Sequence, residues 1–180
     1  VYPLKGYYVG AEVEKIGMGI FNHVDMTTLE VQYAKFFELK YKFYTAHSIQ
    51  TKLTTPSNHP YFNVQGLGYG QKLVRGYELN VIDGQHYILN RNEFKKHLFS
   101  HKHNLEKVIK ISQLNVVPYS LYFKLHTDIG YVINNAENPL NNTLTNRVLL
   151  GYGAGFDLFS FYDMVIRFEY SFNNLSLIHI

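Results

Sequence analysis

The chain has 180 residues, of which 46% are hydrophobic, 17% charged and 16% aromatic, and it contains neither cysteine nor tryptophan. This aromatic content excludes a disordered chain, and the lack of cysteine excludes a disulfide scaffold and thiolate metal sites. The net charge of +3 is spread thinly, so we expect no nucleic-acid partner. No run approaches the ~18 consecutive apolar residues of a membrane-spanning helix. Val1 to Gly6 lack a signal-peptide pattern, which predicts either a cytoplasmic protein or an internal segment of a longer exported chain.

Three segments near the C-terminus alternate regularly between polar and apolar residues with a period of two, which is typical of β-strands, and four earlier segments do so less regularly. The predicted strands cover residues 6–16, 26–39, 42–54, 85–98, 119–133, 147–159 and 162–172. Most are far longer than the ~5–6 residues usual in soluble sheets. Two connections are long, from Thr55 to Gly84 and from about His101 to Val117. The chain is therefore predicted to be all-β.

Strand length and polarity together indicate an antiparallel transmembrane β-barrel. A tilted strand of ~9–11 residues spans a bilayer, with apolar side chains toward lipid and polar ones toward the lumen. Aromatic residues at the strand ends fit interfacial girdles: Tyr7, Tyr8, Phe36, Phe37, Tyr119, Phe159, Phe161 and Tyr162. The alternative is an aromatic-rich soluble β-sandwich or a lipocalin-like barrel. Bacterial barrels normally have an even number of strands, so seven strands predict an incomplete barrel.

The connection from Thr55 to Gly84 is too long for a passive hairpin loop and is predicted to be functional. It contains the segment GLGYGQKLVRGYE, residues 66–78. Its glycines lack dinucleotide-binding spacing and do not open a helix. Arg75 could direct its planar guanidinium toward carboxylates inside the barrel.

These residues resemble the bacterial surface-antigen superfamily, the BamA and TamA type of outer-membrane assembly factor. Val74-Arg75-Gly76-Tyr77 is similar to the Val-Arg-Gly-Phe/Tyr signature of that family, and the resemblance runs from about residue 3 to 173. Further matching segments occur in the family's order: PLKGY at 3–7, NEF at 92–94, DIGYV at 128–132, LGYGAGFD at 150–157 and IRFEY at 166–170. The residues after the signature, Glu78 and then VIDGQ at 81–85, look closest to Bacteroidota-type members of the family.

The resemblance implies that residues 1–180 are the C-terminal part of a 16-stranded outer-membrane barrel behind periplasmic POTRA repeats. The loop 55–84 would fold into the lumen, where Arg75 would pair with Glu93 and Asp128. Glycines Gly130, Gly151, Gly153 and Gly155 would leave room for it on the lumen face. After residue 173 the expected last strand is missing or altered, and residues 174–180 depart from the family pattern.

The function implied is non-enzymatic: insertion or translocation of client proteins at the outer membrane of a Gram-negative bacterium. The implied partners are outer-membrane lipid, unfolded outer-membrane protein clients, the POTRA repeats and accessory lipoproteins. No cofactor is implied. Two alternatives are an outer-membrane pore or surface-binding barrel without an assembly role, and a barrel anchor of an upstream phospholipase domain. The sequence preceding residue 1 would discriminate between these three functions.

Histidines offer weaker candidates. His97, His101 and His103 lie close in sequence, but metal ligands need to converge from several elements, so we expect these side chains to be solvated. His126 and Asp128 share a strand face, which could suggest acid–base chemistry. Without a nucleophile at a recognisable spacing, a lumen salt-bridge network is the favoured interpretation.

Overall fold

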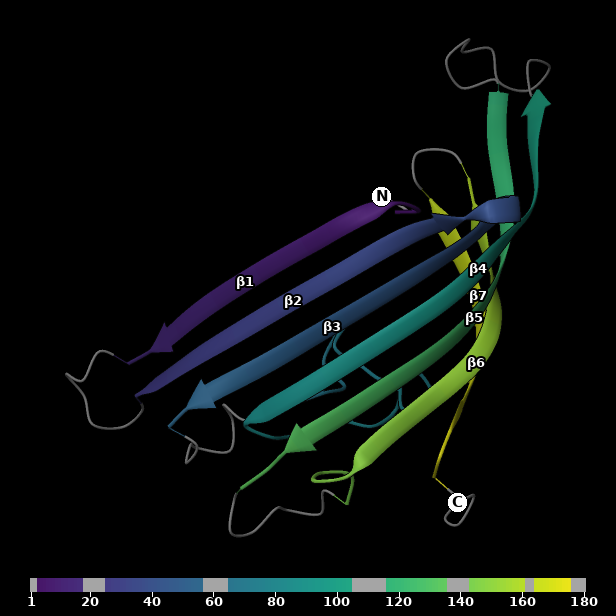
Figure 1. Cartoon of the computed structure of the whole chain (residues 1–180). Helices are drawn as coiled ribbons and strands as arrows, with labels where there is room; N and C mark the ends of the chain where they lie inside the picture. Colours follow the sequence, from purple (N-terminus) through teal and green to yellow (C-terminus); the bar gives the residue numbers. More distant parts are fainter. Residues whose placement is uncertain are drawn as a thin grey trace.

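The computed structural model describes residues 3–17, 25–56, 65–104, 116–135, 143–160 and 164–175. In these residues the chain forms one curved sheet of seven antiparallel strands that follow one another in chain order (Figure 1). The strands are β1 (Gly6–Ile16), β2 (Met26–Leu39), β3 (Phe43–Thr55), β4 (His86–Asn104), β5 (Val116–Ile133), β6 (Val148–Phe159) and β7 (Val165–Asn173), with a single 3-10 turn, η1 (Lys40–Lys42), between β2 and β3. No helix among the described residues is both long enough and apolar enough to cross a membrane.

The seven strands predicted from alternation are confirmed, with shifts at some ends. β3 begins at Phe43 because Tyr41 and Lys42 adopt positive φ angles of 59° and 60° in the preceding turn. β4 and β5 are longer than predicted, because their pairing with each other continues as far as Asn104 and Val116. β7 begins at Val165, and the predicted start at Tyr162 lies outside the described residues.

The register places exposed apolar side chains of all seven strands on one outer face. Leu29, for example, lies opposite Val13 on β1 and Leu53 on β3. Exposed apolar residues of this face occur on every strand: Tyr7, Val9, Val13, Leu29, Val31, Tyr33, Ile49, Leu53, Ile88, Phe94, Leu125, Ile129, Tyr152, Phe156, Ile166, Phe168, Tyr170 and Phe172. Because antiparallel neighbours align side chains directly opposite each other, these residues form an apolar band across the sheet.

A short polar row interrupts this band. His47, Asn90 and Asn92 lie on the outer face of β3 and β4. His47 Nδ1 lies 2.8 Å from Asn92 Oδ1, and Asn92 Nδ2 donates to Asn90 Oδ1 at 2.5 Å. The side chains of this row therefore hydrogen-bond one another, and the amide groups of Asn90 and Asn92 also donate to the backbone carbonyls of Ser48 and Thr127.

The inner face has the opposite character, because charged side chains are buried there. Lys95, Lys124, Asp128 and Asp157 are each at most 6% exposed. Burial of so many ionised groups costs free energy unless each finds a partner. The ion pairs that provide these partners are described below.

The sheet is open in the described part of the chain, with β1 and β7 as its edges (Figure 1). The predicted all-β class and antiparallel pairing are therefore confirmed. Closure into a barrel, a membrane location and a total of sixteen strands stay predictions.

Candidate functional site

The candidate site is the connection between β3 and β4, whose residues 65–85 pack against the inner face of the sheet (Figure 1). Within it, Leu67 and Ile82 exchange two backbone hydrogen bonds of 2.9 and 2.8 Å. Its apolar side chains join those of β4, β5 and β6 in a buried cluster: Leu67, Val74, Tyr77, Ile82, Tyr87, Leu89, Val132, Leu144 and Leu149. Residues 65–85 thus lie against the inner face of the sheet, and residues 57–64 of the predicted loop lie outside the described part; that this face lines a barrel lumen stays a prediction.

Arg75 projects from this connection onto the inner face, where it meets Asp128 of β5 and Glu93 of β4. Its Nε and Nη2 atoms donate to the two carboxylate oxygens of Asp128 at 2.8 and 2.6 Å. Its Nη1 atom donates to Glu93 Oε1 at 2.6 Å. The backbone N–H of Arg75 adds a bond of 3.1 Å to Asp128 Oδ2. One guanidinium therefore bridges two strands and the loop.

The electrostatics of Arg75 follow from this enclosure. Burial alone lowers the pKa of a guanidinium, because the charged form loses its hydration. Here the bonds and charges of Asp128 and Glu93 outweigh that effect and raise the pKa of Arg75 above its usual range. The side chain therefore stays cationic, and fully buried Asp128 has its countercharge.

The ion-pair network continues beyond these three residues, toward β6 and β7. Arg75 Nη1 lies 3.9 Å from Glu169 Oε1 on β7. Lys124, only 1% exposed, bonds Glu169 and lies 2.9 Å from Asp157 of β6. Lys95 pairs with the second oxygen of Glu93 at 2.8 Å. The sequence analysis did not identify Lys124, Asp157 and Glu169 as site residues. Their positions on the polar faces of their strands were the one feature that could have indicated it.

The neighbours of Arg75 in the motif attach the loop to the end of β7. The carbonyl of Gly76 accepts a hydrogen bond of 2.6 Å from Asn173 Nδ2, and the hydroxyl of Tyr77 donates to Asn174 Oδ1. Gly76 has a φ of +93°, and a Cβ there would crowd the backbone of Phe172. Burial raises the pKa of the Tyr77 hydroxyl above its usual range. Val74, the first residue of the motif, is buried against Gly130.

The predicted lumen glycines lie on the inner face, and added methyl groups there would meet other atoms. A Cβ at Gly151 would overlap the carbonyl oxygen of Arg75, and one at Gly130 would overlap Val74. Cβ atoms at Gly153 and Gly155 would instead meet backbone carbonyls of β7. Two of the four glycines therefore make room for the loop, and the other two make room for the neighbouring strand.

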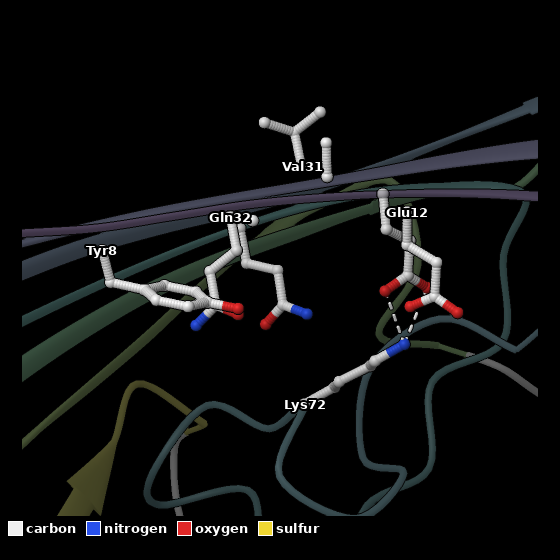
Figure 2. Close-up of a pocket in the computed structure, with 9 residues that line it drawn as sticks. Tyr8, Glu12, Val31, Gln32 and Lys72 are labelled. Carbon is white, nitrogen blue, oxygen red and sulfur yellow. Dashed lines mark hydrogen bonds and ion pairs between the residues drawn. The ribbon is translucent and has the colours of Figure 1, made fainter.

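A second anchor holds the loop toward the β1 edge. Lys72 Nζ donates to both carboxylate oxygens of Glu30 on β2, each at 2.7 Å (Figure 2). Beside this pair lies a polar hollow of about 330 Å³. Figure 2 shows Tyr8, Gln32 and Glu12 on the hollow side of the sheet, with Val31 on the opposite side.

Three of the histidines considered in the sequence contact side chains of other strands. His126 Nε2 lies 3.0 Å from Ser171 Oγ on β7. Its Nδ1 is buried and has no hydrogen-bond partner within the described residues. His97 and His101 lie on β4 and contact tyrosines of β5. For His103 the structure describes the backbone only.

Comparison of the chain with family models, with curated protein sequences and with solved structures found no significant match. The site is therefore interpreted from its geometry. A loop fixed by ion pairs to β2, β4 and β5, and by hydrogen bonds to β7, acts as a brace across the inner face.

Proposed function

We propose that this chain is part of the wall of an outer-membrane β-barrel of the BamA and TamA type, which inserts or translocates client proteins in a Gram-negative bacterium. The remaining strands of the barrel would pair with the open edges of β1 and β7. The inner face would line the lumen, and the loop carrying Arg75 would brace it. The proposed partners are lipid, unfolded clients, POTRA repeats and accessory lipoproteins.

The observation that carries this proposal is the inverted distribution of polarity. Apolar and aromatic side chains are exposed along the outer face of every strand, whereas Arg75, Lys124 and Asp128 are buried on the inner face. Soluble monomers rarely expose contiguous apolar patches larger than a few hundred Å². Transmembrane barrels require apolar residues outside and polar residues inside.

The brace and the edges support an assembly role. A β-strand edge in hydrocarbon leaves backbone groups unsatisfied, so the edges of β1 and β7 require further strands. An edge that can open can accept a client strand by β-augmentation. The contacts of Gly76 and Tyr77 with Asn173 and Asn174 place the brace next to the β7 edge.

Adjacent residues on β2 provide a matched test of the membrane orientation. Val31 is 41% exposed on the outer face, and Gln32 points into the polar hollow (Figure 2). Arg at an outer position near the midplane costs ~2–4 kcal/mol in lipid, whereas a lumen position tolerates it. We therefore expect Val31→Arg to reduce assembly of the full-length protein into membranes and Gln32→Arg to preserve it, measured by heat-modifiable electrophoretic mobility. Equal damage from both changes would favour a soluble sandwich.

Client insertion into proteoliposomes tests the assembly role itself. The full-length protein should accelerate folding of an added outer-membrane protein relative to empty liposomes. A barrel that conducts ions without accelerating client folding would instead be a pore, and the assembly proposal would then be abandoned.

A further inference from the structure

The hairpin of β4 and β5 extends past the neighbouring strands at one end of the sheet. The last residue of β4 paired with β3 is Lys96, and the first residue of β5 paired with β6 is Ser120. Beyond them, β4 and β5 pair with each other as far as Asn104 and Val116. Figure 1 shows this extension rising beyond the turn η1 between β2 and β3.

The two edges of this extension differ. On β5, Pro118 has no N–H group to offer, and its carbonyl accepts a bond of 3.4 Å from Ser160 Oγ. On β4, residues Phe99–Asn104 pair only with β5 in the described part of the chain. These six residues contain no proline and span ~20 Å at ~3.3 Å each. The β5 edge is thus blocked at Pro118, whereas the β4 edge offers backbone donors and acceptors that pair with no other strand among the described residues.

The side chains along the free edge alternate in character. Phe99 and His101 lie on the outer face, where both rings contact Tyr119. Ser100 and Lys102 lie on the inner face, opposite Ser120 and Pro118. Lys40 and Lys42, both exposed, form part of the turn that ends the adjacent β2–β3 pair. A strand added here would therefore meet the rings of Phe99 and His101 on one side and the cationic Lys102 on the other.

We propose that the free edge of β4 from Phe99 to Asn104 docks an extended segment of a partner protein in which apolar and acidic residues alternate. Backbone hydrogen bonds would supply much of the affinity, and the alternating side chains would select the register. Apolar residues would pack beside Phe99 and His101, and carboxylates would lie near Ser100 and Lys102. The evidence for the free edge is the strand pairing of β4 and does not depend on the proposed function. On the proposed function this edge lies in the periplasm, because short turns mark the periplasmic side of such barrels and this end of the sheet carries the three-residue turn η1.

The test uses the full-length protein in non-ionic micelles and four synthetic nine-residue probes. The first alternates Val and Glu, the second alternates Val and Lys, the third carries a central proline in the acidic sequence, and the fourth scrambles the acidic sequence. We expect only the Val/Glu peptide to bind by fluorescence anisotropy. Its binding should slow hydrogen exchange of free-edge amides within Phe99–Asn104 about tenfold or more.

Charge variants at Lys102 test whether its positive charge contributes to binding of the acidic peptide. Lys102→Glu should weaken binding of the acidic peptide about tenfold, because it replaces attraction by repulsion, whereas Lys102→Arg should retain it. Lys15→Glu changes an exposed lysine at the other end of the sheet and should leave binding unchanged. Equal binding of the acidic and basic peptides, or binding without protection of Phe99–Asn104, would overturn the proposal.

Binding to lipid vesicles distinguishes a protein partner from an anionic membrane surface as the ligand of this edge. If Lys102→Glu weakens binding to phosphatidylglycerol vesicles while no peptide binds, the edge recognises lipid and the proposal fails. Because the peptide assay needs neither membrane insertion nor a client, its outcome is distinct from that of the Val31 and Gln32 comparison. A protein that fails that comparison and still binds the acidic peptide retains the docking edge and loses the proposed barrel function.

Discussion

Arg75 fixes the position of the loop because its guanidinium contacts groups from two strands at once. Three of its side-chain nitrogens are committed to Asp128 and Glu93 at 2.6–2.8 Å. Asp128 has no exposed surface, so its charge depends on this partner. Removal of either member of a buried pair leaves the other charge uncompensated, at a cost of ~3–5 kcal/mol.

We therefore expect Arg75→Ala in the full-length protein to increase protease cleavage within the loop and to reduce the free energy of unfolding by ~3 kcal/mol. Lys should rescue only partly, because an ammonium group cannot make the planar two-pronged contact with Asp128 while reaching Glu93. Arg147→Ala is the control, since Arg147 is exposed and its guanidinium bonds a single carbonyl at 3.3 Å. Its effect should stay within ~0.5 kcal/mol.

Asp128→Asn completes a double-mutant cycle with Arg75→Ala. Each single change leaves one buried group without its charged partner, whereas the double change removes both charges. The double variant should therefore cost less than the sum of the two single variants. Strictly additive losses in urea unfolding, or an Arg75→Ala protein with an unchanged loop, would contradict the role assigned to this ion pair.

At the scale of elements, the fit between loop and strand depends on missing side chains on β6. An added Cβ at Gly151 would overlap the Arg75 carbonyl, which is backbone and has little freedom to move. At Gly10 on β1, the same addition would meet the end of the Tyr8 side chain, which can rotate. The two glycines are therefore a matched pair of strand positions with different surroundings.

Gly151→Ala should displace the loop and destabilise the full-length protein by ~1–3 kcal/mol, as overpacking of a filled site does. Gly10→Ala should have a much smaller effect, because the contacted ring can turn aside. Hydrogen exchange of residues 65–85, compared between the two variants, checks this expectation. Similar loop protection in both variants would mean that β6 and the loop adapt more readily than the contacts suggest.

The elements differ in how far the sequence predicts them. β1 and β2 match their predicted ranges, although their period-two alternation is less regular than that of the later strands. The contact of Arg75 with Glu93 and Asp128 was expected from a family resemblance and from strand parity. Parity assigns a face but not a register, so it could not pair Lys124 with Asp157 and Glu169. Nor could it join Tyr77 to Asn174, which lies 97 residues away.

For the whole molecule, the decisive feature is that both sheet edges and the outer face lack partners within the described residues. β1 and β7 each expose one row of backbone donors and acceptors, and the outer face presents Tyr7, Phe168 and Tyr170 at 65–73% exposure. In water, edges of this length beside an apolar surface pair with other chains. In lipid, acyl chains cover the apolar surface, but the backbone donors and acceptors of the two edges still lack hydrogen-bond partners.

The isolated chain of residues 1–180 should therefore aggregate in aqueous buffer and require detergent to stay dispersed. In micelles we expect β-rich circular dichroism together with oligomers, because detergent covers the outer face but leaves the edges of β1 and β7 free to pair with other copies. Size-exclusion chromatography with light scattering, with and without detergent, measures both effects. A longer chain that carries the additional strands of the proposed barrel is the control and should be less prone to such association in the same detergent, because those strands would cover these edges. A soluble monomer of residues 1–180 that unfolds cooperatively in water would contradict the barrel proposal, because its apolar face and edges would then be stable without lipid or further strands.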